Sequence, residues 1–130
     1  MIHLDTSFLI RALVPGSPED SRLREWLGAG EPLCMSAIAW AELLCGPIET
    51  VTEELATEVI AHRRAFTEDD AGVAARLFNE SGRRRGTLID CMIAATALED
   101  DAAIATANTA DFRRFAGSGL VVLNESKREA

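Results

Sequence analysis

The chain has 130 residues, of which 48% are hydrophobic, and this is typical of one globular domain and unlike a disordered chain. A formal net charge of −8 disfavours a general nucleic-acid binder, because phosphate is bound by positively charged surfaces. No apolar run approaches the ~20 residues that span a bilayer, and residues 1–14 lack the basic leader of a signal peptide. We therefore expect no membrane association.

The three cysteines, Cys34, Cys45 and Cys91, have no C-x-x-C spacing. They are expected to be buried thiols in a reducing cytoplasm rather than a disulfide or zinc framework. No repeat or linker divides the chain, so a single domain is expected over residues 1–124, followed by a polar tail at 125–130.

Strands and helices are predicted to alternate. In chain order we expect a strand at 2–4, helices at 6–13 and 18–27, a strand at 33–35, helices at 37–45, within 48–63 and 68–81, and at 87–98, a strand at 102–106, a helix at 109–115 and a strand at 120–123. Pro18 opens the second helix, Ser36 can cap the third, and Gly46-Pro47 ends it. Such alternation predicts an α/β fold whose parallel sheet is covered on both faces.

Three acidic residues are the only formal charges in long apolar segments. They are Asp5 across the ten residues of MIHLDTSFLI, Glu42 across the fifteen of CMSAIAWAELLCGPI, and Asp90 across the twelve of TLIDCMIAATAL. An ionised carboxylate in such surroundings is unfavourable unless something compensates its charge. One shared divalent cation would do so, since carboxylates are hard oxygen ligands suited to Mg²⁺ or Mn²⁺.

Each acid also has a structural interpretation. Asp5 could cap the first helix, Asp90 could form a capping box with Thr87, and Glu42 could point to solvent. A fourth acid, Asp111, precedes two arginines and could be an ordinary surface residue.

The predicted topology gathers these acids. Asp5 directly follows the first strand, Asp111 follows the third by five residues, and Ser36 closes the second strand before the helix of Glu42. In an open parallel sheet, ligands bind beyond the carboxyl ends of the strands where the strand order reverses. The acids are therefore expected at one edge of the sheet.

Four pieces of sequence together resemble the PIN domain, and more narrowly the toxin subunit of VapBC toxin–antitoxin pairs. They are LDTSFLI, SAIAWAELLCG, RRRGTLIDCMIAATAL and IATANTADF, which span residues 1 to about 112 in the family's order. The resemblance implies a three-layer α/β/α sandwich with a mostly parallel sheet. It also implies an acidic quartet binding one or two Mg²⁺ or Mn²⁺ ions, formed by Asp5, Glu42, Asp90 and Asp111.

The same resemblance gives Ser7, Thr106 and Asn108 a supporting polar role beside the acids. It implies a cytoplasmic, metal-dependent endoribonuclease that cleaves RNA phosphodiesters through a metal-activated water. Such a toxin would form a homodimer and be silenced by a cognate antitoxin whose C-terminal segment covers the site. Ala107 departs from the pattern, because many relatives have arginine there, and this shifts attention to Arg83–Arg85 as a possible RNA contact.

Alternatives remain for several features. Arg83–Arg85 could be a solvated loop or a docking surface for an acidic partner. His3 lies between apolar neighbours and is expected to be a satisfied core residue, and His62 is expected at the surface. A histidine-based acid–base ribonuclease therefore has little support.

Two other functions compete with a nuclease. A non-catalytic interaction module of the same fold is one, and a metal-dependent cleavage assay would separate it. A phosphoaspartate-type phosphoryl-transfer domain is the other. It is disfavoured because Ser7 stands where a phosphatase would have a second Asp, and because the sole lysine, Lys127, is in the tail.

Overall fold

The computed structural model describes residues 1–124 and contains a sheet of five short strands in the order β3-β2-β1-β4-β5. The strands are β1 (Ile2–Leu4), β2 (Leu33–Ser36), β3 (His62–Arg64), β4 (Ala103–Ala105) and β5 (Val122–Leu123). All four pairings between them are parallel. The expected α/β class with a parallel sheet is confirmed.

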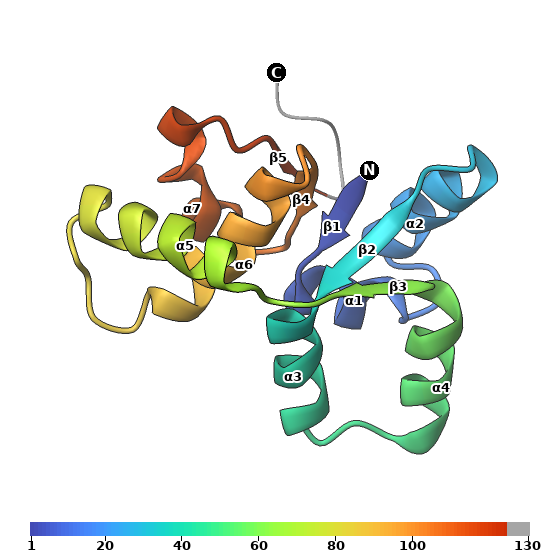
Figure 1. Cartoon of the computed structure of the whole chain (residues 1–130). Helices are drawn as coiled ribbons and strands as arrows, with labels where there is room; N and C mark the ends of the chain where they lie inside the picture. The colour runs from blue at the N-terminus through green and yellow to red at the C-terminus, as the bar shows by residue number, and fades with distance from the viewer. Residues whose placement is uncertain (125–130) are drawn as a thin grey trace.

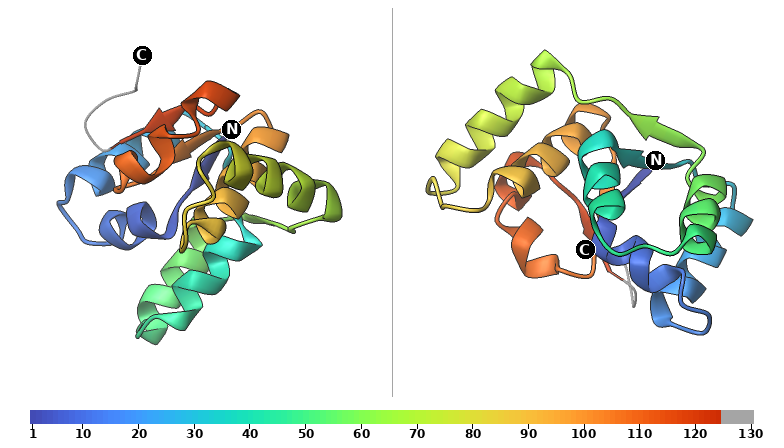
Figure 2. Two further views of the ribbon diagram at one scale, coloured as in Figure 1. Left: turned by 90° about the vertical axis from the view of Figure 1, so that its left-hand side faces the viewer. Right: turned by 90° about the horizontal axis from the view of Figure 1, so that it is seen from below.

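Seven α-helices and one 3₁₀ turn connect these strands. They are α1 (Thr6–Ala12), α2 (Pro18–Gly28), α3 (Ala37–Cys45), α4 (Thr50–Val59), α5 (Glu68–Glu80), α6 (Leu88–Glu99), α7 (Thr109–Arg113) and η1 (Ala116–Ser118). Figure 1 shows α5, α6 and α7 on one side of the sheet and α1 and α2 on the other, which gives three layers. Figure 1 shows α3 and α4 extending away from the lower ends of β1 and β2, and the right-hand view of Figure 2 shows the two helices standing apart from each other.

The core lies between the sheet and its two helical layers. β1 and β2 are buried along their whole length, and on one face Phe8 of α1 stacks on Trp26 of α2 with ring centroids 5.4 Å apart. On the other face, α6 is buried on most of its circumference, since it touches α5, α3, α7 and the sheet. Its many alanines allow this close approach, because small side chains let neighbouring elements pack tightly.

The strand order reverses between β1 and β4. From β1 the chain builds outward to β2 and β3, then crosses back to add β4 and β5 on the opposite edge. Residues that follow β1 and β4 therefore flank the switch point at which open α/β sheets bind ligands.

Most elements lie where the sequence predicts them, but the helix expected within 48–63 does not continue to its end. α4 stops at Val59, Ile60 is extended with φ −97° and ψ 92°, and β3 follows. β3 has three residues at the sheet edge, two of them exposed. A strand this short and polar shows no alternation of hydrophobic residues, so the sequence pattern does not indicate it.

Two smaller expectations are also corrected. Cys45 is exposed at the end of α3, whereas Cys34 and Cys91 are buried thiols as expected. The helix expected at 109–115 is α7 followed by the separate turn η1. Among the described residues no helix is long and apolar enough to cross a membrane. The expected tail at 125–130 lies outside the described residues.

Candidate active site

Asp5 directly follows β1 and is the most buried of the four acids, with 5% of its surface exposed. Its backbone N–H donates to the carbonyl of Ala105 at the end of β4, at 2.9 Å. Its Oδ2 accepts hydrogen bonds from Ser7 Oγ at 2.8 Å and from Thr106 Oγ1 at 2.9 Å. Two hydroxyls from opposite sides of the strand switch therefore fix one carboxylate oxygen in place.

The turn after β4 is tied to the same hydroxyls. The backbone N–H of Ala107 donates to Ser7 Oγ at 3.1 Å, and that of Asn108 donates to Thr106 Oγ1 at 2.9 Å. Thr106 is fully buried, whereas Asn108 is exposed. Ser7 and Thr106 thus lie beside Asp5 as the resemblance implies, while Asn108 contributes its backbone to this network.

Glu42 reaches the same region from α3. Ser36 caps this helix as expected, since Ser36 Oγ accepts from the Ala39 N–H at 3.0 Å. Thr6 Oγ1 also donates to the Ala39 carbonyl at 2.7 Å and so ties α3 to the start of α1. The pKa of Glu42 is raised, first by burial and then by the negative charges of Asp5 and Asp90. The side chain is exposed, yet it stands within the field of the other acids.

Asp90 lies in the first turn of α6, the helix that leads back into β4. This turn therefore lies near the carboxyl edge of the sheet. Burial, Asp111 and Asp5 raise the pKa of Asp90 to about 6, while Arg114 acts in the opposite direction. Asp111 itself is exposed on α7. The structure thus links all four acids electrostatically, with Asp5 and Asp90 at the centre.

Arg114 is the residue that sequence reasoning missed. Its Nη2 donates to Asp90 Oδ2 at 3.2 Å, and its guanidinium lies over the ring of Phe115. In the sequence this arginine follows Asp111 by three residues and resembles ordinary surface charge, whereas its partner Asp90 is 24 residues away. No local pattern could have indicated it.

The helix-capping interpretations of Asp5 and Asp90 are contradicted. Asp5 stands at the cap position of α1, but its side chain makes no capping hydrogen bond. Thr87 makes none at the start of α6 and donates instead to the Arg84 carbonyl at 2.7 Å. Neither carboxylate is needed to begin its helix.

The donor set fits a hard divalent cation. Four carboxylates surround the switch point, and mutual repulsion and burial raise the pKa of two of them. Within residues 1–124, no three of these four carboxylates have ligand atoms within 4.8 Å of one another. Like charges without a counter-ion favour such spacing, and a cation would draw them together.

Comparison with known families gives a match to the PIN domain model over residues 2–118. The chain belongs to the PIN domain family. Comparison with curated proteins gave no match.

Several solved structures share this PIN fold. The VapBC-1 complex of nontypeable Haemophilus influenzae is 25% identical with a TM-score of 0.72, and the match covers 98% of this chain and 100% of that chain. A toxin–antitoxin complex from Klebsiella pneumoniae is 22% identical, with a TM-score of 0.75 and coverage of 98% and 99%. VapC20 of Mycobacterium tuberculosis, a toxin that cleaves the sarcin–ricin loop, is 16% identical, with a TM-score of 0.65 and coverage of 98% and 99%. The last two similarities concern the fold alone.

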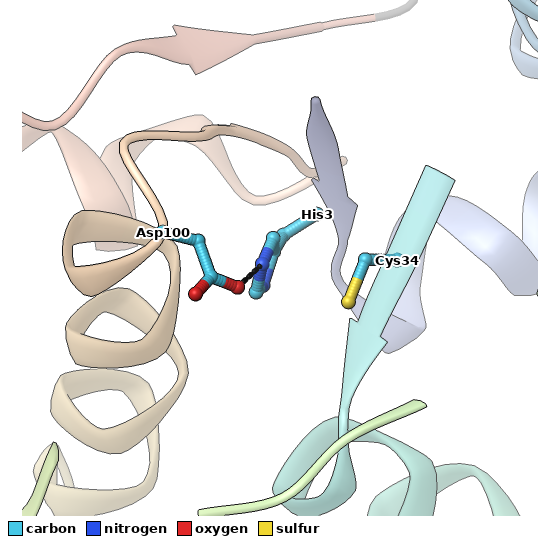
Figure 3. A group of neighbouring side chains, drawn as sticks. All are labelled: His3, Cys34 and Asp100. Carbon is cyan, nitrogen blue, oxygen red and sulfur yellow. Dashed lines mark hydrogen bonds and ion pairs between the residues drawn. The ribbon is translucent and has the colours of Figure 1, made fainter. Parts of the chain in front are cut away.

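A second group of ligand-type side chains lies elsewhere in this PIN domain. His3, Cys34 and Asp100 bring one ligand atom each within 4.8 Å of one another (Figure 3). His3 Nε2 contacts Asp100 Oδ2 at 2.8 Å, and Arg64 Nε donates to both oxygens of Asp100 at 3.1 and 3.2 Å. Burial raises the pKa of the Cys34 thiol to about 11, which keeps it protonated at neutral pH.

This group is engaged in internal pairing. Arg64 also pairs with the fully buried Asp70, which accepts from the Thr67 N–H at the start of α5. The chain of contacts joins β1, β3, α5 and the end of α6, and a metal ion would have to displace both the arginine and the thiol proton. His3 is buried and its Nε2 is paired with Asp100, but its Nδ1 is buried without a hydrogen-bond partner, so the expectation of a satisfied core histidine is confirmed only in part. His62 is exposed, as the sequence predicts.

The three arginines Arg83–Arg85 are all exposed between α5 and α6. Their loop is anchored, because the Arg83 N–H donates to the Phe78 carbonyl at 2.9 Å and its Nη1 donates to Asn79 Oδ1 at 2.6 Å. The loop leads directly into the helix of Asp90. The three arginines therefore precede one acid of the quartet in the chain, at the N-terminal end of α6 where Asp90 lies.

Proposed function

We propose that this chain is a Mg²⁺- or Mn²⁺-dependent endoribonuclease and the toxin of a type II toxin–antitoxin pair. The observation that carries the proposal is the convergence of four carboxylates on the strand switch, with the pKa of Glu42 and of Asp90 raised by their neighbours. Arg114 pairs with Asp90, but the pKa of Asp90 stays raised because burial and the neighbouring acids outweigh this one cation. Acids kept close despite repulsion are typical of active sites.

Asp5, Glu42, Asp90 and Asp111 would hold one or two ions. When bound, a divalent cation polarises a phosphoryl oxygen, lowers the pKa of water and stabilises the leaving oxygen. The residues of the chain supply positioning: Ser7 and Thr106 orient Asp5, and the short parallel strands fix the spacing of the acids. Without a cation, the combined charge of the acids would repel an RNA phosphate.

The substrate and partner are part of the proposal. Arg83–Arg85 would contact the RNA backbone beside the quartet. The toxin–antitoxin complex VapBC-1, which is 25% identical to this chain, supports an antitoxin partner. An RNA substrate is proposed from the acidic quartet and from membership of the PIN domain family. A homodimer, as family members commonly form, is also proposed.

An exposed apolar region supports a protein partner. A pocket of about 330 Å³ lies between α1 and the α3–α4 connection, lined among others by Ile10, Leu43 and Ile48. Ile10 is 51% exposed, although it lines this pocket. Clustered apolar side chains at a surface are typical of sites that another chain covers.

A cleavage assay tests the nuclease. The purified chain, incubated with total cellular RNA, should cut it in Mg²⁺ or Mn²⁺ and lose activity in EDTA, and Asp5→Asn should be inactive under all conditions. The matched control is Asp20→Asn, which removes the same charge from α2. Undiminished cleavage in excess chelator would refute metal dependence, and metal binding without any cleavage would favour the non-catalytic module.

A further inference from the structure

Arg114 occupies an unusual place at the edge of the quartet. Its side chain is 18% exposed, and its guanidinium carbon lies 5.1 Å from the ring centroid of the buried Phe115. From this position it donates one hydrogen bond, to Asp90. An aromatic ring and a carboxylate thus hold a permanent cation against a candidate metal ligand.

The guanidinium has donors to spare. It carries five N–H groups in a planar fork, and within residues 1–124 the structure gives it the single hydrogen bond to Asp90. Its Nε is buried without a partner. Arginine–carboxylate pairs are often bidentate, with two parallel hydrogen bonds to the two oxygens. The contact of Arg114 with Asp90 is not bidentate, so it leaves most of the capacity of the guanidinium unused.

We propose that Arg114 is a displaceable counter-ion of the acidic quartet, which gives Asp90 up to a divalent cation and then binds the phosphate of the RNA. The proposal rests on the function proposed above. In the metal-free chain Arg114 partly neutralises Asp90, whose remaining neighbours are acids. A cation bound by Asp90 competes with the guanidinium for the same oxygens and repels it.

The freed guanidinium then matches a phosphate well. Its fork can donate two parallel hydrogen bonds to phosphoryl oxygens, which the point charge of a lysine cannot do. The surface beside Arg114 is open, since Arg114 lines a pocket of about 220 Å³ together with Glu80, Ser81, Gly117 and Ser118. Arg114 is the cation of this pocket and Glu80 its acid. The chain thereby keeps a positive group ready at a site that is otherwise acidic.

Metal affinity tests the first step without any need for RNA. Mn²⁺ binding should be measured by titration calorimetry for the parent chain, Arg114→Gln, Arg114→Lys and the control Arg76→Gln, an exposed arginine on α5. Arg114→Gln should bind Mn²⁺ about fivefold more tightly, the effect expected of losing one partly exposed competing ion pair. Arg114→Lys and Arg76→Gln should bind it as the parent does. Equal or weaker binding by Arg114→Gln would overturn the proposal and make Arg114 a structural clamp of Asp90.

RNA affinity tests the second step. Binding of a labelled single-stranded RNA should be measured with Ca²⁺ in place of Mg²⁺ to limit cleavage, at a Ca²⁺ concentration that saturates each variant. Both Arg114→Gln and Arg114→Lys should bind RNA several-fold more weakly than the parent and Arg76→Gln. Unchanged RNA affinity in both variants would overturn the phosphate role. A parent chain that cuts no RNA would refute the proposed function. The competition between Arg114 and the metal ion would then be judged by the calorimetry alone.

Discussion

At the scale of single residues, Asp90 is the position where stability and the proposed activity conflict most. Burial and two neighbouring acids disfavour its ionised form more strongly than Arg114 favours it, since its pKa is raised to about 6. The shift from the ordinary value of 3.8 corresponds to at most about 3 kcal/mol. Active sites commonly carry such a cost because the arrangement serves the reaction rather than the fold.

We therefore predict that Asp90→Asn stabilises the metal-free protein at pH 7. Asparagine removes the repelled charge and can still accept the hydrogen bond from Arg114, so the melting temperature should rise by about 5 °C. Cleavage of RNA should be lost. Added Mg²⁺ should stabilise the parent more than the variant, because a ligand that binds the folded state stabilises it by mass action. A variant that melts lower without metal and still cuts RNA would refute the role of Asp90.

The same carboxyl predicts a pH dependence. Between about pH 4 and pH 6 the unfolded chain releases the Asp90 proton while the folded chain retains it, so rising pH lowers the free energy of unfolding over this range. Urea titrations of the metal-free parent and of Asp90→Asn should differ little at pH 4. The variant should gain its advantage progressively up to about pH 6, and a constant difference across this range would contradict the raised pKa.

At the scale of secondary structure, the sequence correctly predicts those helices that begin at a capping residue or a proline. Ser36 caps α3 and Pro18 opens α2, and both elements lie where they are expected. β3 carries no such signal, because Arg63 pairs in register with Met35 and Arg64 reaches Asp100, which is 36 residues away. A strand held by such distant contacts cannot be recognised from its own three residues.

The ion pairs of Arg64 allow a prediction of the stability lost when this residue of β3 is replaced. Arg64 is 17% exposed and Asp70 is fully buried, so Arg64→Met would leave a buried carboxylate without its cation. We expect a loss of about 3–5 kcal/mol in the free energy of unfolding. The control Arg24→Met, which breaks an exposed pair with Asp20, should cost less than about 1 kcal/mol. Chemical denaturation of the two variants measures the difference. Equal losses would show that the buried pair contributes no more to stability than the exposed pair.

The loop between α5 and α6 makes a prediction about RNA. If Arg83–Arg85 contact phosphates, replacing all three by alanine should weaken RNA binding and flatten its dependence on salt, while Mn²⁺ affinity survives. Replacing Arg24 and Arg76, which are exposed on α2 and α5, should have less effect for each charge removed. An unchanged salt slope would favour a solvated loop or a docking surface.

At the scale of the whole molecule, the candidate site was predictable where single charges interrupt apolar segments. Asp5, Glu42 and Asp90 stand out in this way, and the parallel topology explains why they meet. Arg114 was not predictable, because its partner comes from another helix and its neighbours in the sequence resemble an ordinary surface. The acids can be recognised from their neighbours in the sequence. The cation that partly neutralises them can be recognised only in the folded chain.

The chain has a net charge of −8, and its proposed site is formed by four acids. This negative charge predicts which residue an antitoxin would use to inhibit the site. An inhibitory segment should place a cation at the quartet, and arginine matches carboxylates best because of its planar fork. Coexpression with the neighbouring antitoxin should yield a complex that is inactive and binds Mn²⁺ more weakly than the free chain. A complex that leaves the four acids open to solvent would contradict this expectation.

The bond between Thr106 and Asp5 joins residues 101 positions apart, and it has a consequence for translation. A ribosome adds roughly 5–20 residues per second, so about 5–20 s separate the synthesis of the two partners. During that time the nascent chain has Asp5 without the hydroxyl of Thr106, and without the strand whose carbonyl fixes its backbone. A growing chain therefore lacks the hydroxyl and the strand that hold Asp5 until β4 has been made, and a chain that ended before β4 could not form this centre.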